Sequence, residues 1–208
     1  MTVMEHTDKV DDRRAQIIGA AIRRFSHFGI DKTSMSEVAD DIKISKANLY
    51  YYFPDKWSLI NAIGDTVIAE SDQEIDKILE RERGRGVEHL LLQVVEIKRA
   101  YFNKYKQLVQ DLDEAHVRDS RFKELTDRIF EKERATTARI LELGIQSGEL
   151  VTMDLKATSE LYTIVMRGLI MYSMYSSPAH FIEPASLDAV HETQKAFVKI
   201  FVRGIIRK

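Results

Sequence analysis

The chain has 208 residues, of which 44% are hydrophobic and none is cysteine, and its formal net charge is −2. This length and hydrophobic content allow one large domain or two small ones with a real core, and the lack of cysteine excludes disulfides and thiolate metal sites. The N-terminal residues lack the apolar core of a signal peptide, and the longest apolar stretch, residues 161–175, is too short for a membrane span. We therefore expect a soluble, cytoplasmic protein.

Residues 11–28 are predicted to form the first long helix. Apolar residues recur there at helical spacing, and Gly29 follows them as a natural C-cap. We expect Phe25 and Phe28 to pack against the helices that come next, because aromatic rings are usually buried.

Two capping signatures predict two short helices over residues 34–53. Ser34 and Glu37 have the S-x-x-E spacing of a capping box, so a helix should begin near Met35. Its predicted inward side consists of Met35, Val38, Ala39 and Ile42. Ser45 is a second N-cap candidate, and it precedes a helix in which Leu49 and Phe53 should pack inward.

The other side of this second short helix is polar and aromatic. A helical wheel places Ala47 and Tyr51 away from the packed side, with Asn48 and Tyr50 flanking them. Lysine and asparagine carry the donors and acceptors that base edges need, and tyrosine hydroxyls reach phosphates. Pro54 suits the first turn of the next helix, where Lys56 would lie beside a free helix N-terminus that favours an anion. This pattern is typical of a helix at the edge of a DNA groove.

The string S-K-x-x-L-Y-x-Y-F-x-x-K, from Ser45 to Lys56, resembles the helix-turn-helix signature of the TetR family of bacterial transcriptional regulators. The resemblance covers residues 11–71, with the motif at 34–53. It implies an all-α protein in which this DNA-binding domain is joined by a long helix to a helical effector-binding and dimerisation domain at 72–208. The residues expected to contact DNA are Thr33, Ser34, Ser45, Lys46, Ala47, Asn48, Tyr50, Tyr51 and Lys56, with Thr33, Ser34 and Lys56 on phosphates.

The chain departs from the family pattern at two positions. Lys43 stands in the turn where the family usually has glycine, so a non-glycine residue must adopt a strained or left-handed backbone there. Ser36 stands where many members have a basic residue, which removes one possible base contact. In addition, residues 1–60 carry nine Lys and Arg and nine Asp and Glu residues. Any positive surface must therefore come from the placement of Lys46 and Lys56.

The rest of the chain is predicted to be helical as well. One helix should run over residues 54–81, and a linker should follow at residues 83–86. Further long helices should cover residues 87–112 and 122–143, the second of them ending at Gly144 or Gly148. Residues 161–175 and 196–206 are apolar nearly all round. Burial within one subunit is one explanation. A second copy covering the helices at about 157–175 and 187–206 is the other, and the family resemblance favours this homodimer.

A dimer with two-fold symmetry should read a palindromic operator with half-sites roughly 34 Å apart. We expect a small-molecule effector to release a repressor of this kind by tilting the helix at 54–81. The candidate effector-pocket residues are Tyr101, Phe102, Tyr105, Phe130, Tyr162, Met166 and Arg167. Arg167 has three candidate partners: an acidic effector, a neighbouring Glu, and a residue across the dimer interface.

Two other classes of protein remain open from the sequence. One is a helical interaction protein that has lost DNA readout, suggested by Lys43 and by the neutral N-terminal domain. The other is a helical enzyme or metal carrier that uses the ligand-rich segment 111–119. That segment lacks the additional Glu and Glu-x-x-His ligands of a helical di-iron site, and no phosphate loop or nucleophile elbow is visible. The sequence therefore predicts neither an enzyme nor a cofactor.

Overall fold

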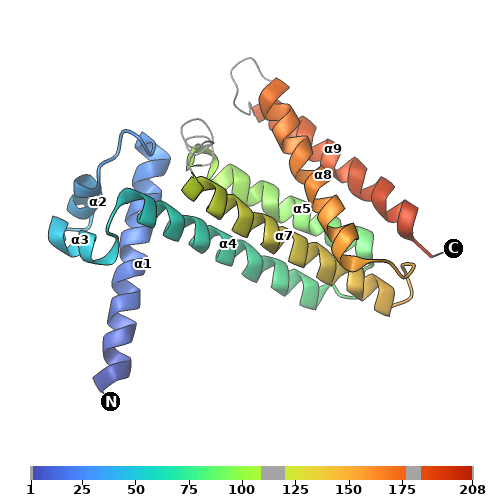
Figure 1. Ribbon diagram of the computed structural model, residues 1–208, viewed down its shortest axis with the longest axis horizontal. Helices are drawn as coiled ribbons and strands as arrows, with labels where there is room; N and C mark the ends of the chain where they lie inside the picture. Colours follow the sequence, from blue (N-terminus) through green and yellow to red (C-terminus); the bar gives the residue numbers. More distant parts are fainter. Residues whose placement is uncertain (1, 109–119, 177–183, 208) are drawn as a thin grey trace. The chain divides into compact units, whose positions relative to one another are not determined.

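The computed structural model describes residues 2–108, 120–176 and 184–207. The helices over these residues are α1 (Thr2–Phe28), α2 (Met35–Asp41), α3 (Lys46–Tyr52), α4 (Lys56–Arg81), α5 (Val87–Lys104), α7 (Ser120–Gln146), α8 (Leu155–Ser176) and α9 (Pro184–Ile205) (Figure 1). The described residues form no strand, and a single bridge pairs Leu150 with Ile206. The all-α prediction is confirmed.

The chain divides into two compact units. The first comprises Met1–Ala69 with Lys104–Leu125, and the second comprises Glu70–Asn103 with Thr126–Lys208. Both α4 and α7 contribute residues to each unit.

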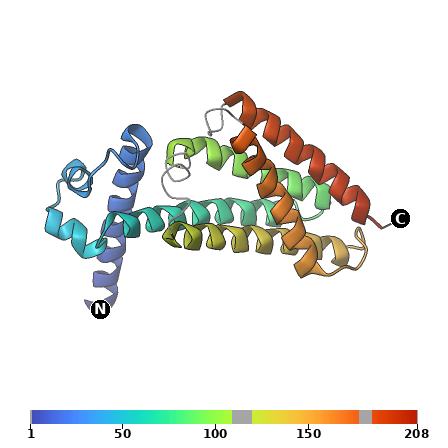
Figure 2. The same ribbon diagram turned by 45° about the horizontal axis from the view of Figure 1, so that its top comes forward.

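The first unit is built on α1, α2 and α3. Figure 2 shows the two short helices beside the longer α1. The core side chains shared by these helices and the first turns of α4 are almost completely buried: Ile17, Ala21, Phe25, Val38, Ala39, Leu49, Phe53, Leu59 and Ile63. The first turn of α7 also belongs here, since the Arg121 guanidinium lies 4.8 Å from the Trp57 ring.

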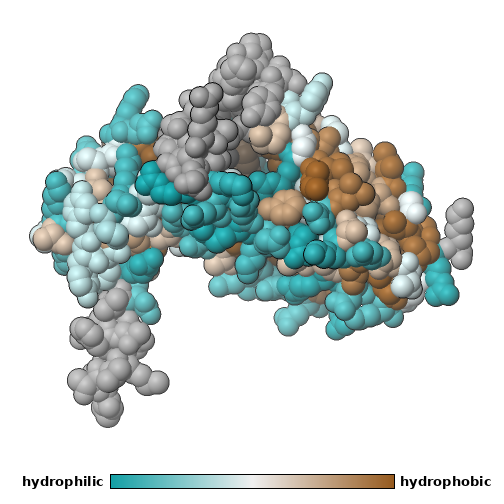
Figure 3. All heavy atoms as spheres, viewed as in Figure 1, coloured by the Kyte–Doolittle hydropathy of each residue, from teal (hydrophilic) through white to brown (hydrophobic). Residues whose placement is uncertain are grey.

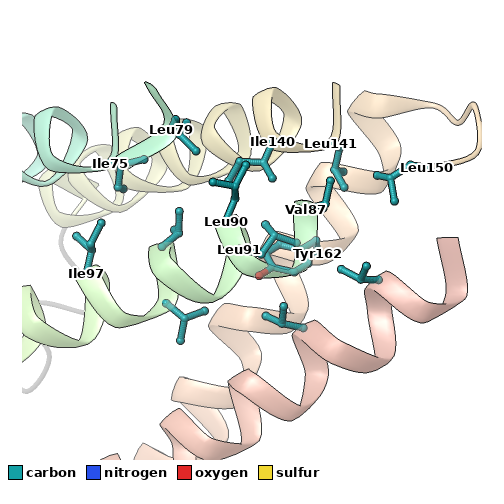
Figure 4. Close-up of a cluster of buried hydrophobic side chains, with 14 residues drawn as sticks. Ile75, Leu79, Val87, Leu90, Leu91, Ile97, Ile140, Leu141, Leu150 and Tyr162 are labelled. Atoms are coloured by element: carbon teal, nitrogen blue, oxygen red, sulfur yellow. The ribbon is translucent and has the colours of Figure 1, made fainter. Parts of the chain in front are cut away.

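The second unit has its own apolar core, contributed by α4, α5, α7, α8 and α9. Figure 4 shows side chains such as Leu90, Ile140 and Tyr162 converging from different helices. Ion pairs join the surfaces of α4 and α7, with Lys132 3.5 Å from Asp72 and Arg139 2.6 Å from Asp76. Helices α8 and α9 pack side by side.

Several helix boundaries differ from the sequence predictions. Helix α1 begins at Thr2, well before residue 11. Helix α4 begins at Lys56, because Asp55 caps it: the Asp55 carboxylate accepts from Ser58 N–H at 2.6 Å, and the Ser58 hydroxyl accepts from Asp55 N–H at 3.3 Å. Helix α5 ends at Lys104. The linker is confirmed between α4 and α5, where Gly86 has a φ of 88°.

The burial predicted for Phe28 is wrong. Phe25 is 1% exposed, but Phe28 is 51% exposed. Phe28 is the last residue of α1, and the chain turns at Gly29, which has a φ of 86°. The Phe28 ring therefore lies at the surface, 4.4 Å from the His27 ring and 5.1 Å from the Arg24 guanidinium.

No helix in the described part of the chain is both apolar enough and long enough to span a bilayer.

Candidate nucleic-acid interface

The start of α2 is fixed by a complete capping box. The Ser34 hydroxyl accepts from Glu37 N–H at 3.3 Å, and the Glu37 carboxylate accepts from Ser34 N–H at 2.7 Å. Hydrogen bonds from the Ser34 N–H, the Ser34 hydroxyl and the Arg24 guanidinium lower the pKa of Glu37 to about 2. The predicted helix start at Met35 is confirmed.

Arg24 ties α1 to α2 through ion pairs with two acidic side chains of α2. Its guanidinium lies 3.0 Å from a Glu37 oxygen and 2.7 Å from an Asp41 oxygen. These two bonds raise the pKa of Arg24, and the bond to Asp41 has the larger effect. Two of the three carboxylates of α2, those of Glu37 and Asp41, are therefore paired with a cation of α1.

The turn between α2 and α3 depends on Lys43. Its φ is 54°, and no other non-glycine residue in the described ranges has a positive φ. Its backbone N–H donates to Asp40 at 3.1 Å, and the following N–H, of Ile44, donates to Ala39 at 3.0 Å. The prediction of a left-handed residue at this position is confirmed. The strain costs roughly 1 to 3 kcal/mol for a non-glycine residue.

Helix α3 begins at its predicted N-cap, where the Ser45 hydroxyl accepts from Asn48 N–H at 3.1 Å. Leu49 is 0% exposed and Phe53 is 1% exposed, so the inward side of the helix is as expected. The Phe53 ring also contacts the Arg14 guanidinium of α1 at 4.6 Å. These contacts fix the rotation of α3 about its axis.

The opposite side of α3 faces outward. Lys46, Ala47 and Asn48 are exposed. Tyr51 is 78% exposed and Tyr50 only 39%, which separates two residues that the sequence left equivalent. The Lys46 ammonium lies 5.7 Å from the Tyr50 ring, and the Tyr51 and Tyr52 rings meet edge to face at 5.2 Å.

Two cations that have no acidic partner in the described part of the chain lie in α3 and at the start of α4. Lys46 and Lys56 make no ion pair with any described residue, whereas Arg24 is paired with acids of α2. The Lys56 ammonium lies 6.0 Å from the Phe25 ring, at the first residue of α4. The formally neutral domain therefore leaves the charges of Lys46, in α3, and of Lys56, the first residue of α4, without an acidic partner among the described residues.

The Thr33 side chain, which was expected to contact a phosphate, makes a hydrogen bond within the protein. Thr33 is 3% exposed, and its hydroxyl donates to the Gly29 carbonyl at 2.9 Å. The side chain closes the turn after α1. The Ser34 hydroxyl is exposed, but it donates to the Glu37 carboxylate at 2.8 Å as part of the cap.

The candidate effector residues are only partly brought together. Tyr105 belongs to the first unit, whereas the other six lie in the second. Tyr162 is a core residue whose ring packs 5.0 Å from Phe201 and 5.6 Å from Phe197. Tyr101, Phe102, Phe130 and Met166 are half-buried.

Arg167 pairs with a neighbouring glutamate, which was one of its three predicted partners. Its guanidinium lies 3.4 Å from Glu133 and 5.9 Å from the Phe130 ring. The sequence did not indicate Glu133 or Lys98 as partners of Arg167, because the three residues belong to three different helices and no sequence pattern connects them.

The candidate metal segment 111–119 lies outside the described residues. Elsewhere in the described ranges, no three His, Asp or Glu side chains gather as metal ligands would.

Known proteins resemble this chain in sequence and in fold. Residues 17–63 match the family model described as bacterial regulatory proteins, tetR family. The uncharacterized HTH-type transcriptional regulator YfiR of Bacillus subtilis is 23% identical over 202 residues, covering 96% of this chain and 95% of YfiR. The HTH-type transcriptional regulator RutR of Escherichia coli K12 is 36% identical over 62 residues, covering 30% of this chain and 29% of RutR. A transcriptional regulator from Cytophaga hutchinsonii has a crystal structure with a TM-score of 0.81 at 26% identity, covering 92% of this chain and 97% of that one.

A capped pair of short helices with the second one exposed defines a helix-turn-helix DNA-binding protein. Residues 17–63 of the chain match the tetR family of bacterial regulatory proteins, and relatives that align over nearly the whole chain are named as transcriptional regulators. The chain is a DNA-binding transcriptional regulator. Regulators of this family bind DNA operators, act as dimers and respond to small-molecule effectors.

Proposed function

We propose that this regulator is a homodimeric repressor that binds a palindromic operator through α3 and leaves it when a small molecule binds the second unit. The observation that carries the proposal is the exposed side of α3, where Lys46, Asn48 and Tyr51 stand opposite the buried Leu49 and Phe53. A helix presented in this way suits the major groove, because its packed side fixes which side chains reach the bases.

The residues of this surface have different expected roles. Lys46 and Asn48 supply donors and acceptors for base edges, and Ala47 supplies a small apolar contact. Tyr50, Tyr51 and Lys56 are assigned to the backbone phosphates, with Ser34 and the Ser45 cap at the edge. Thr33 is not assigned a DNA contact, since its hydroxyl is buried and bonded.

The proposed dimer forms through α8 and α9. Large apolar side chains that are 41–75% exposed follow one side of α8: Leu161, Ile164, Met171 and Tyr172. Ile200 on α9 is 69% exposed. Figure 3 shows hydrophobic residues gathered over these two helices. An exposed apolar surface of this kind is typical of a protein interface, and the same pair of helices from a second copy is the simplest cover.

The proposed release mechanism uses the helices that both units share. Helix α4 supplies Leu59 and Ile63 to the first core and Ile75 and Leu79 to the second. A ligand that favours one packing of the second core would therefore bias the direction of α4. The coupling counts as allosteric only if both sites bias the same two states.

Capture of genomic DNA fragments by the purified protein tests this proposal. We expect enrichment of a few fragments that share a palindrome, and release of those fragments when an extract of small metabolites is added. A matched protein with Asn48→Ala and Tyr51→Ala should capture no specific fragment while keeping its melting temperature. Equal capture by both proteins would refute readout through α3.

A further inference from the structure

Three charged side chains from three different helices meet in the second unit. Glu133 of α7 accepts from the Lys98 ammonium of α5 at 2.8 Å and from the Arg167 guanidinium of α8 at 3.4 Å. The three side chains are 22–36% exposed, so a small molecule can reach them. We call Lys98, Glu133 and Arg167 the Glu133 cluster.

The charges of the Glu133 cluster do not balance. Two cations share one carboxylate, and no other described carboxylate lies within ion-pair distance of Lys98 or Arg167. The nearby Arg134 has acidic partners of its own: it bonds Glu131 at 2.8 Å and also feels the charge of Glu160. The cluster therefore carries one excess positive charge.

Arg167 is only weakly engaged by Glu133. A guanidinium has five donors in a planar fork that matches a carboxylate at two points. Within the described residues, Arg167 uses one hydrogen bond, and at 3.4 Å this bond is long for a charged pair. Most of its donors are therefore available to a ligand.

The surroundings of the cluster are apolar and aromatic. The Phe130 ring lies 5.9 Å from the Arg167 guanidinium. Tyr162 is buried, and burial together with the charge of Glu133 raises the pKa of its phenol well above the usual range. Tyr162 therefore stays neutral and adds no negative charge to balance the cations. The backbone carbonyl of Met166, on the same helix, accepts a hydrogen bond from the Gln194 side-chain amide of α9 at 3.1 Å.

We propose that the Glu133 cluster binds the carboxylate of a monoanionic organic acid with an apolar or aromatic body. The ligand carboxylate takes the free donors of Arg167 and shares Lys98, so Glu133 acts as an internal competitor for both cations. A monoanion balances the excess charge, and the neighbouring aromatic residues cover its apolar body. This inference rests on the proposed function, because it names the chemical class of the effector.

Paired probes of the full-length protein test the charge requirement. The probes are benzoate, hexanoate and indole-3-acetate, each compared with its carboxamide and with an amine of similar size, by thermal shift and calorimetry. We expect at least one carboxylate to bind at least tenfold more tightly than its amide. Arg167→Gln should weaken that carboxylate at least tenfold, and Glu133→Gln should strengthen it several-fold by removing the competitor. Arg139→Gln, which breaks the analogous pair with Asp76, is the matched control and should change nothing.

Three results would overturn the assignment. The first is that an amine binds and Glu133→Gln abolishes it, which would make the cluster a cation site. The second is equal binding of each acid and its amide. The third is that none of the carboxylates binds the Glu133→Gln protein, in which both cations lack their internal partner. These measurements involve no DNA. If the protein binds an operator but no carboxylate, this inference is refuted and the proposed operator binding is not.

Discussion

The ammonium group of Lys46 lies 5.7 Å from the centre of the Tyr50 ring, one turn further along the exposed side of α3. The contact holds an unpaired cation over a half-exposed aromatic ring instead of against a carboxylate. This arrangement leaves the charge of Lys46 available to DNA, and the first prediction follows from it.

Lys46→Ala should weaken operator binding by about 1 to 3 kcal/mol and relax the sequence preference at one position, as expected for a base contact. Fluorescence anisotropy with an operator duplex and its single-base variants measures both effects. Lys77→Ala, which removes an exposed lysine of α4 outside the first unit, is the control. A uniform loss over all sequences with a shallower salt dependence would instead make Lys46 a phosphate contact.

Glu37→Gln should reduce stability at neutral pH but have little effect in strong acid. The folded pKa of Glu37 is about 2 against an ordinary value of 4.5, so its contribution is present above pH 4.5 and is lost as the pH falls toward 2. Urea unfolding of both proteins at a series of pH values measures the difference. A difference that stays constant across this pH range would show that the charge of Glu37 is not what stabilises the cap.

Lys43→Gly should stabilise the protein by up to about 1 kcal/mol, since relief of the left-handed backbone outweighs the added flexibility of the unfolded chain. Lys43→Ala removes the same charge without relieving the backbone, and it should not stabilise. Denaturant unfolding separates the two variants. If Lys43→Gly instead raised operator affinity strongly, Lys43 would be impairing DNA readout, as the interaction-protein alternative supposes.

Leu161→Glu should convert the dimer to a monomer and reduce operator binding severely, because it places a charge in the apolar surface of α8. Light scattering gives the oligomeric state and anisotropy gives the DNA affinity. Val151→Glu also adds a charge at a half-exposed apolar residue, outside α8 and α9, and it should leave both unchanged. A Leu161→Glu protein that remains dimeric would place the interface elsewhere.

Gly144→Ala should destabilise the second unit by about 1 to 3 kcal/mol through overpacking. A Cβ atom at Gly144 would lie 2.4 Å from the Val87 side chain and 2.7 Å from that of Leu150, where α7 meets the start of α5. Gly19→Ala is the control, since its Cβ would meet only Arg23 at an ordinary 3.5 Å, and it should be neutral or stabilising. Calorimetric melting of the two variants compares them directly.

Local signals in the sequence predicted the N-terminal unit in detail. Caps at Ser34 and Ser45, the inward pair Leu49 and Phe53, and the left-handed Lys43 all depend on neighbouring residues, so a single stretch of chain determines them. The hydrogen bond from the Thr33 hydroxyl to the Gly29 carbonyl was not foreseen, because sequence spacing does not show whether a hydroxyl is already used.

The second unit was less predictable because its polar contacts join distant segments. Glu133 is 35 residues from Lys98 and 34 from Arg167 in the sequence. The helix was expected to end at Gly144 or Gly148, and α7 runs through Gly144 to Gln146. At Gly144 the missing side chain makes room for Val87 and Leu150, a role that the sequence did not indicate. Only the packing of separate helices reveals either role.

Selection of random duplex DNA by the purified protein, at a stated near-physiological salt concentration, tests the central claim most directly. The account predicts an enriched palindrome whose half-sites are centred about one helical turn apart or slightly more, and loss of enrichment with the Leu161→Glu protein. No enriched sequence from a folded, dimeric protein, with or without added cell extract, would contradict it.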